Sequence, residues 1–482
     1  MANVDTNVEK SISEILGFLC VNSKYGNTYT ANNVHEILKL LSDSLKHQSQ
    51  RENMSNAVIH ALGGLLQFLG VELQTYSDGA TKDVAVIQGI AECFRCLRNS
   101  CVQCDINQNE IGKGKILADT IQLVTGLMNQ IHKDEDILIC VRCAMQFMGN
   151  LVTNNNQCKQ LVWKLLDLNL HRSLLQSGDT KLCSYSCMVL HNVLDDTRCN
   201  ELILDKNGQL VLKAVINIVQ DTESEWGLFI IERCLQCQDF LEKIYCELDI
   251  PCRSLMLDVI ESSMKNDECK KEEVPSISPG NVTFLSTEFI ICVKYIEGMT
   301  ADNSEVSQLV LHILEILCLC SSSRHFSHVL QAHTTLLGTV IDLLKNITEL
   351  GKQPDSVFSC VNKLKSKKTS ESPAHGVKCS LIQLIANLVH KNKANQNMVK
   401  DTGGLELIMN LTKIDGNNPF ITEWAVLALR NLCEDNPDIR SIIANTTIDG
   451  VANKSEILKD FGIEAEVKDK KLLLKRPNKD ST

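Results

Sequence analysis

Four cysteines near position 100 have the spacing of a metal site. They are Cys93, Cys96, Cys101 and Cys104, in the pattern C-x2-C-x4-C-x2-C. Four thiolates can surround a tetrahedral zinc ion. The same spacing also suits a helix core, because residues three apart share one helical face and a thiol is a small apolar group. No Gly or Pro turn interrupts the cluster, so we favour buried thiols and keep metal binding as the alternative.

Groups suited to catalysis or phosphate binding are sparse. Residues 112–115 read Gly-Lys-Gly-Lys, but a P-loop needs a Gly five positions before the Gly-Lys pair, and Asn107 and Asn109 stand there. The chain also has no G-x-S-x-G motif and no H-E-x-x-H motif. We therefore expect a protein that is not an enzyme and that binds no cofactor.

Charge and composition exclude some classes of binding partner. The 482 residues carry 48 basic and 59 acidic side chains, a net charge of −11, which disfavours a general nucleic-acid binder. The start of the chain lacks the pattern of a secretory signal, and the apolar run Leu309–Cys320 is too short to span a bilayer. We expect a cytoplasmic protein with free thiols, no membrane insertion and no nucleic-acid partner.

A recurrent Asn indicates the helices that must position the residues discussed above. It closes five apolar, helix-like runs, each followed by another apolar residue 10 to 12 positions later. Asn192 follows Asn150 by 42 residues, and Asn431 follows Asn387 by 44. This period predicts an all-α fold, an armadillo/HEAT-like right-handed helical solenoid. The five residues are Asn99, Asn150, Asn192, Asn387 and Asn431.

The recurrent Asn allows two interpretations. In armadillo repeats the third helix lines a groove, where an Asn can bind the backbone of an extended peptide. The side chain can instead bond to a neighbouring repeat and fix the packing, as buried polar groups usually do. An importin-like receptor for basic peptides would need a Trp four residues earlier, and none of the five sites has one.

Composition divides the chain into seven parts. Charged or Ser-rich stretches with few apolar residues separate the helical runs. The predicted parts are a helical cap at 1–90, armadillo-like repeats at 91–261, a charged linker at 262–283, helical repeats at 284–350, a basic disordered loop at 351–376, C-terminal armadillo-like repeats at 377–460 and a tail at 461–482, which we expect to form one short element.

Hydroxyl groups in the two predicted loops are candidate phosphorylation sites. A phosphate there would neutralise nearby Lys charges or create a docking charge, whereas the alternative is an inert loop. The candidates are Ser278, Thr369, Ser370 and Ser372.

The C-terminal repeats resemble a known family. The segments 378–388, 391–396, 415–425 and 430–434 are similar to the C-terminal domain of the ataxin-10 family. In and after these segments, Asn418-Pro419 and Asn436-Pro437 each predict an N-cap followed by the first helical residue. Phe420 and Trp424, four apart, are expected to share a face and anchor the repeat.

The resemblance also implies a function. It implies a non-enzymatic scaffold in cytokinesis, centrosome or cilium function, neuron survival and neurite outgrowth. The implied locations are cytoplasmic and perinuclear, including centrosome, midbody and cilium basal body. The implied partners are G-protein β subunits, a cytosolic glycosyltransferase, mitotic kinases and a second copy of the chain. The alternatives are a nuclear-transport-type peptide adaptor and a metal-binding protein.

Overall fold

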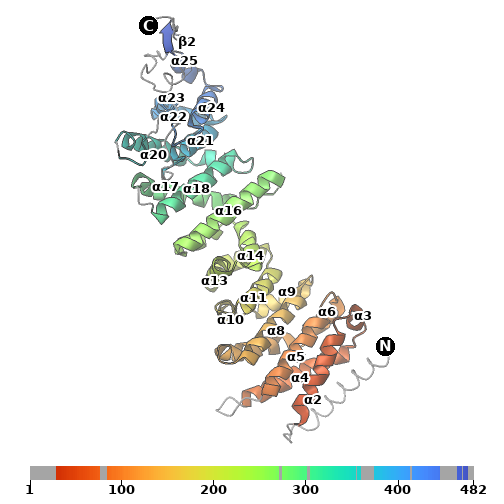
Figure 1. Ribbon diagram of the computed structural model, residues 1–482. Helices are drawn as coiled ribbons and strands as arrows, with labels where there is room; N and C mark the ends of the chain where they lie inside the picture. Colours follow the sequence, from red (N-terminus) through yellow and green to blue (C-terminus); the bar gives the residue numbers. More distant parts are fainter. Residues whose placement is uncertain are drawn as a thin grey trace. The chain divides into compact units, whose positions relative to one another are not determined.

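The computed structural model describes residues 29–75, 84–270, 274–300, 304–353, 355–359, 374–412, 415–445, 464–468 and 471–475. The chain divides into two compact units, one ending at Ile244 and one beginning at Tyr245. Figure 1 labels helices and strands of both units.

Unit 1 consists of helices that pack on their neighbours in chain order (Figure 1). Its elements are α2 (Tyr29–Ser44), α3 (Gln48–Glu52), α4 (Asn56–Thr75), α5 (Val84–Ser100), α6 (Asp105–Lys113), α7 (Ile116–Leu127), η1 (Met128–Gln130), α8 (Glu135–Val152), α9 (Asn156–Leu165), α10 (Leu168–Leu175), α11 (Thr180–Val193), α12 (Asp196–Leu204), α13 (Lys206–Thr222), α14 (Glu225–Leu235) and α15 (Phe240–Ile244).

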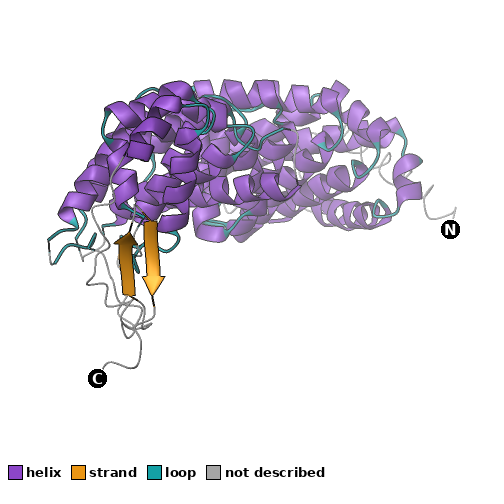
Figure 2. Cartoon of the chain, turned by 90° about the horizontal axis from the view of Figure 1, so that it is seen from above, coloured by secondary structure: helices purple, strands orange, loops and turns teal. Residues whose placement is uncertain are grey.

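Unit 2 is also helical and ends in a short antiparallel hairpin, drawn in orange in Figure 2. Its elements are η2 (Tyr245–Glu247), α16 (Ile250–Lys270), α17 (Pro279–Glu297), α18 (Glu305–Ser322), α19 (Ser327–Ala332), α20 (Leu336–Leu350), α21 (Val377–Val389), α22 (Lys393–Asp401), α23 (Gly404–Asn410), α24 (Ile421–Cys433), α25 (Pro437–Asn445), β1 (Glu464–Lys468) and β2 (Lys471–Lys475).

One helix of each repeat stacks on its counterpart in the next. We call these the ladder helices: α2, α5, α8, α11 and α14 in unit 1, and α18, α21 and α24 in unit 2. Leu, Ile, Val and Cys fill the space between them, and Phe94 of α5 stacks on Phe147 of α8 with ring centroids 6.2 Å apart. The predicted all-α, armadillo-like solenoid is confirmed by this repeated stacking.

Short polar side chains start many of the helices. Asp134, Asn155, Asp179 and Asp195 accept hydrogen bonds from backbone N–H groups in the first turns of α8, α9, α11 and α12. An N-cap of this kind satisfies donors that the helix itself cannot pair. At the other end of a helix, Gly403 has φ +76° and forms the tight turn between α22 and α23.

Some predicted boundaries are wrong. The linker expected at 262–283 is shorter, because α16 continues to Lys270 and α17 begins at Pro279. Within the segment 351–376, expected to be a disordered loop, Phe358 is buried and its carbonyl accepts a bond from Lys378 Nζ (2.7 Å). The tail forms two strands where one element was expected.

Among the described residues, two helices are long and apolar enough, by length and composition, to cross a membrane. They cover Asn56–Leu73 in α4 and Glu305–Ser322 in α18. In this structure α4 packs on α5, α6 and α7, and α18 packs on α16, α17 and α21. Their apolar side chains therefore contribute to the solenoid core, and the absence of membrane insertion stays a prediction.

Candidate functional site

The recurrent Asn side chains reach across to the preceding ladder helix. Each donates through its side-chain amide to a group near the end of that helix, and Asn99 and Asn431 are buried. The bonds run from Asn99 to Ser42 O (2.8 Å), from Asn150 to Arg98 O (3.1 Å), from Asn192 to Gly149 O (3.5 Å) and Thr153 Oγ1 (3.4 Å), from Asn387 to Ser321 Oγ (2.8 Å) and from Asn431 to Ala386 O (2.9 Å). These amides join neighbouring repeats, and peptide binding by them stays a prediction.

A second set of amides in unit 1 closes the end of α8. Gln108 Nε2 donates to Asn150 O (2.8 Å) and Thr153 O (3.0 Å), two carbonyls at the end of the helix, the first of which also accepts a bond from Thr153 N (3.4 Å). Asn155 Nδ2 donates back to Gln108 Oε1 (3.3 Å) and Asn109 Oδ1 (2.9 Å). We call this arrangement the α8 clamp.

Unit 2 repeats the arrangement at the end of α24. Gln396 Nε2 donates to Asn431 O (2.9 Å) and Glu434 O (3.1 Å). Asn436 Nδ2 donates to Gln396 Oε1 (3.2 Å) and Asn397 Oδ1 (3.3 Å). This is the α24 clamp, and the Asn436 N-cap predicted for α25 is confirmed by its bond from Ile439 N.

Sequence reasoning missed both clamps, although a signal was present. In each, the Gln follows a ladder Asn by nine positions, and the returning Asn follows the next ladder Asn by five. The shared Asn-Gln-Asn tripeptide at 107–109 and 395–397 marks the place. Pairing the two occurrences would have predicted a common polar contact between repeats.

The Cys93–Cys104 cluster has its thiols in different contacts. Cys93 Sγ lies 3.6 Å from Leu62 O, Cys96 Sγ lies 3.2 Å from Leu38 O, and Cys104 Sγ lies 3.8 Å from Arg51 O. The acceptors belong to α4, α2 and α3, so these thiols point to different neighbours. Within the described ranges, no three His, Cys, Asp or Glu side chains are arranged to hold a metal ion.

Burial makes these thiols poor nucleophiles. It raises the pKa of the Cys93 thiol to about 12, with a smaller contribution from the Glu92 carboxylate. It also raises the pKa of Cys96 and Cys101. A thiol of such high pKa stays protonated near neutral pH and behaves as a small apolar group in the core.

Phe420 does not anchor the C-terminal repeat, and that prediction is wrong. Its side chain is 69% exposed, and its φ of +64° places it before α24, which begins at Ile421. Trp424 is half-buried on α24. The helix begins two residues later than the Pro419 start we predicted, so the four-residue spacing no longer means one shared helical face.

Asn418 caps a different helix from the one predicted. Its Oδ1 accepts bonds from Lys378 N (2.9 Å) and Cys379 N (3.3 Å), in the first turn of α21. Its Nδ2 donates to Asp415 Oδ2 (2.7 Å). The loop before α24 therefore holds the start of the preceding ladder helix.

The accessible Ser predicted at position 278 is also wrong. Ser278 is only 4% exposed, and its Oγ accepts a bond from Asn281 N as the N-cap of α17. Helix α17 starts directly after it, so the expected loop does not reach this side chain. Thr369, Ser370 and Ser372 lie outside the described residues.

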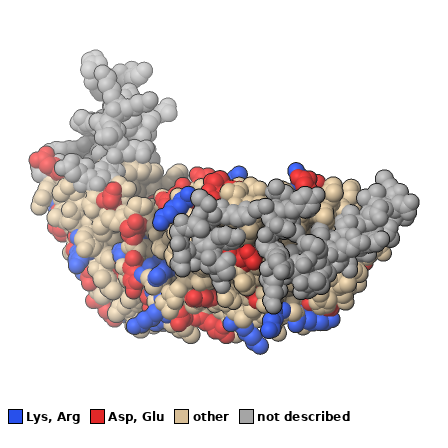
Figure 3. Space-filling view, turned by 90° about the horizontal axis from the view of Figure 1, so that it is seen from below, with Lys and Arg blue, Asp and Glu red and all other residues tan. Residues whose placement is uncertain are grey.

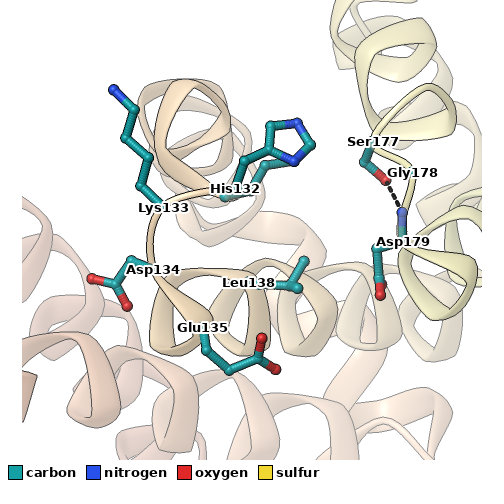
Figure 4. A pocket seen from close by; sticks show the side chains of 9 residues that line it. His132, Lys133, Asp134, Glu135, Leu138, Ser177, Gly178 and Asp179 are labelled. Carbon is teal, nitrogen blue, oxygen red and sulfur yellow. Dashed lines mark hydrogen bonds between the residues drawn. The ribbon is translucent and has the colours of Figure 1, made fainter.

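A polar hollow of about 400 Å³ lies at the starts of α8 and α11 (Figure 4). Asp134 and Asp179 on its wall already cap these helices, and Ser177 Oγ accepts a bond from Asp179 N. Arg142 pairs with Asp179 at 2.9 and 2.5 Å, and this bond holds the pKa of the carboxyl below its usual range. The carboxylates thus serve helix ends and repeat contacts.

The junction of α11 with α14 is closed by charged groups. Arg233 of α14 donates to Leu194 O (2.6 Å), and Arg198 of α12 donates to Val193 O. Trp226 and Phe229 of α14 lie beside His191 of α11. Sequence reasoning missed this cluster, although spacings of three and four along 226–233 place Trp226, Phe229 and Arg233 on one helical face.

Elsewhere, charge is mixed. On the face shown in Figure 3, outside the grey atoms, Lys and Arg are interspersed with Asp and Glu. That face shows no broad basic field of the kind that phosphate backbones require.

The comparisons with known proteins agree with the repeats just described. The model of the spinocerebellar ataxia type 10 protein domain matches residues 377–475. Ataxin-10 of Bos taurus is 30% identical over 448 residues, covering 91% of this chain and 94% of that protein. Ataxin-10 of Xenopus tropicalis is 31% identical over 445 residues, covering 91% of each. The ataxin-10 homolog of Dictyostelium discoideum is 46% identical over 100 residues, covering 21% and 16%.

Among solved structures, an engineered protein is similar to 64% of this chain and 96% of its own, with a TM-score of 0.33 and 16% identity. We base no argument on so low a score. The fold follows from the stacked helices themselves.

Proposed function

This chain belongs to the ataxin-10 family, and from that premise we propose that it is a non-enzymatic scaffold that binds other proteins through its helical repeats. The observation that carries the proposal is the stacked series of ladder helices in each unit. Stacked repeats present a long row of side chains that a partner can follow, and solenoids commonly use such surfaces for binding.

The family resemblance supplies the finer part of the proposal. We propose roles in cytokinesis, at the centrosome or cilium base, and in neuron survival and neurite outgrowth. The proposed locations are cytoplasmic and perinuclear, with the centrosome, midbody and basal body. G-protein β subunits, a cytosolic glycosyltransferase and mitotic kinases are the proposed partners, together with self-association.

The C-terminal repeats are our first choice for a recognition surface. Val426 of α24, Ile442 of α25 and Phe420 are exposed apolar side chains there. Exposed apolar groups of this kind are suited to contacts with a partner when they lie together.

Proximity labelling of the full chain in dividing cells tests the proposal. A chain with Val426→Asp and Ile442→Asp should lose centrosomal or midbody partners, and Leu204→Asp, an exposed change in unit 1, should keep them. If the starting chain labels no such proteins, the proposed cell-division role is wrong. If the double variant keeps them all, recognition lies outside the C-terminal repeats.

A further inference from the structure

Three aromatic rings form a small shelf where α11 meets α14. The ring centroid of His191 lies 5.3 Å from that of Trp226 and 5.6 Å from that of Phe229. Trp226 and Phe229 meet edge to face at 5.9 Å. Phe229 is 38% exposed, and the other two are half-buried. We call these three residues the aromatic shelf; it offers ring faces and edges to one apolar side chain.

Three half-buried cations lie next to the shelf, on three different helices. They are Lys159 of α9, Arg198 of α12 and Arg233 of α14, which we call the cation cluster. The guanidinium groups of Arg198 and Arg233 are held by the adjacent carbonyls of Val193 and Leu194. An Arg has five N–H donors, so these bonds orient each group and leave donors for a ligand.

Few acidic groups neutralise the positive charge of the cation cluster. Asp195 pairs with Arg198 at 3.5 Å, whereas the Lys159 ammonium makes no hydrogen bond or ion pair with any described residue. The pKa of Lys159 is lowered by burial and then by the nearby charges of Arg233 and Arg198, and Asp195 opposes this only as the smallest contribution. The pKa of His191 is lowered mainly by burial, with smaller contributions from Arg233 and Lys159. Positive charge is therefore concentrated beside the aromatic rings.

Charge complementarity indicates which kind of ligand would bind at the aromatic shelf and the cation cluster. Three cations, of which Arg198 alone is ion-paired among the described residues, attract a short acidic segment, although the whole chain has a net charge of −11. A nucleic acid would instead need a longer basic surface. Trp226 and Arg233 are seven residues apart on α14, about 10 Å along the helix axis. An extended peptide covers that distance in about three residues.

We propose that the aromatic shelf and the cation cluster together bind an extended acidic segment of a partner protein. One apolar side chain of the segment packs on Trp226 and Phe229. Carboxylates about two to three residues away lie among Lys159, Arg198 and Arg233. This inference rests on the proposed scaffold function and names the chemistry of one partner.

The test is fluorescence anisotropy with the purified full chain and a labelled nine-residue peptide. The peptide has a central Phe, Glu two and three positions to either side, and Gly or Ser elsewhere. One matched peptide has Gln in place of each Glu, and another has Ala in place of the Phe. We expect saturable binding of the first peptide and at least about tenfold weaker binding of both matched peptides.

Two variants test the site itself. Lys159→Glu should weaken binding by about tenfold or more, because it reverses a charge in the cluster, and Phe229→Ala should weaken it by removing the exposed ring. Neither should change the melting temperature appreciably, since Lys159 has no partner to lose and Phe229 is partly exposed. The matched controls are Lys164→Glu, an exposed change on the same helix, and Leu204→Ala, an exposed apolar truncation; both should bind as before.

The proposal is overturned by equal binding of the Glu and Gln peptides, by unchanged affinity in Lys159→Glu, or by no saturable binding at millimolar peptide. Failure of the scaffold function is a separate result. Proximity labelling would then find no partner proteins, whereas failure of this inference alone leaves the labelled set intact in Lys159→Glu.

Discussion

The ends of α8 and α24 are closed by neutral amides, whereas the end of α11 is closed by arginines. At α8 and α24, Gln108 and Gln396 donate to carbonyls at the helix end and themselves accept a bond from the Asn that precedes the next helix. At α11, Arg198 and Arg233 occupy the carbonyls. Both kinds of side chain donate hydrogen bonds to the carbonyls at the helix end, but only the arginines place charge at the surface. A contact that stabilises the fold can therefore also create a binding site.

The comparison also bears on where the family resemblance is clearest. The C-terminal repeats match the family model, yet their buried amides mainly hold one repeat to the next. A strong resemblance can thus reflect repeat packing as much as recognition.

The largest expected change in the free energy of unfolding comes from lowering the pH. The amide clamps do not titrate, whereas buried His171 does. Burial lowers the pKa of His171 in α10 from 6.5 to about 4, and neither ring nitrogen has a partner among the described residues. The unfolded chain binds a proton between those values and the folded chain does not. Stability should therefore fall by roughly 3 kcal/mol as pH falls from 6.5 to 4.

Denaturant unfolding of the whole chain across that pH range measures the loss. His171→Leu should remove this part of the pH dependence, and His390→Leu, at an exposed position, should leave it in place. An unchanged acid slope in His171→Leu would show that other groups cause the loss.

The next effect tests whether the two clamps are equivalent. Gln396→Leu removes the side-chain donor from the carbonyls of Asn431 and Glu434, and Gln108→Leu removes it from those of Asn150 and Thr153. Each change should cost about 2 kcal/mol, because two buried or part-buried hydrogen bonds are lost at once. Thermal unfolding and amide hydrogen exchange of each unit measure the cost.

An exposed amide provides the control for both clamps. Gln160→Leu, on the surface of α9, should change stability by no more than a few tenths of a kcal/mol. A large difference in stability loss between the two clamp variants would show that the same hydrogen-bond geometry contributes differently to the stability of the two units.

A smaller effect separates strong from weak ladder bonds. Asn431 is buried and donates at 2.9 Å, so Asn431→Ala should cost about 1 kcal/mol. Asn192 is half-buried with long contacts of 3.5 and 3.4 Å, so Asn192→Ala should cost only a few tenths. Denaturant midpoints of the two variants compare them, and equal losses would contradict the distance argument.

The smallest effect concerns Phe420. Because its side chain is 69% exposed, Phe420→Ala should change the free energy of unfolding by less than about 0.5 kcal/mol. Trp424→Ala in the same repeat should cost more, since Trp424 is half-buried. A melting curve for each variant decides this, and a large loss in Phe420→Ala would restore the anchor role that its exposure argues against.

The sequence by itself determined the helical solenoid and several of its helix boundaries. The spacing of apolar residues, the Gly403 turn and the Asn436 cap all depend on neighbours within a few positions. Such local rules are readable from a single chain, which is why the repeat period near 42 to 44 residues predicted the stacking of ladder helices correctly.

Only the tertiary structure decided which partners the polar residues find. The acceptor of Asn431 lies 45 residues away and that of Asn387 lies 66 away, so no local pattern specifies them. One left-handed residue, Phe420, delays the start of α24 and redirects Asn418 to α21. The shelf and cluster at α11 and α14 likewise draw on four helices, and only packing brings their side chains together.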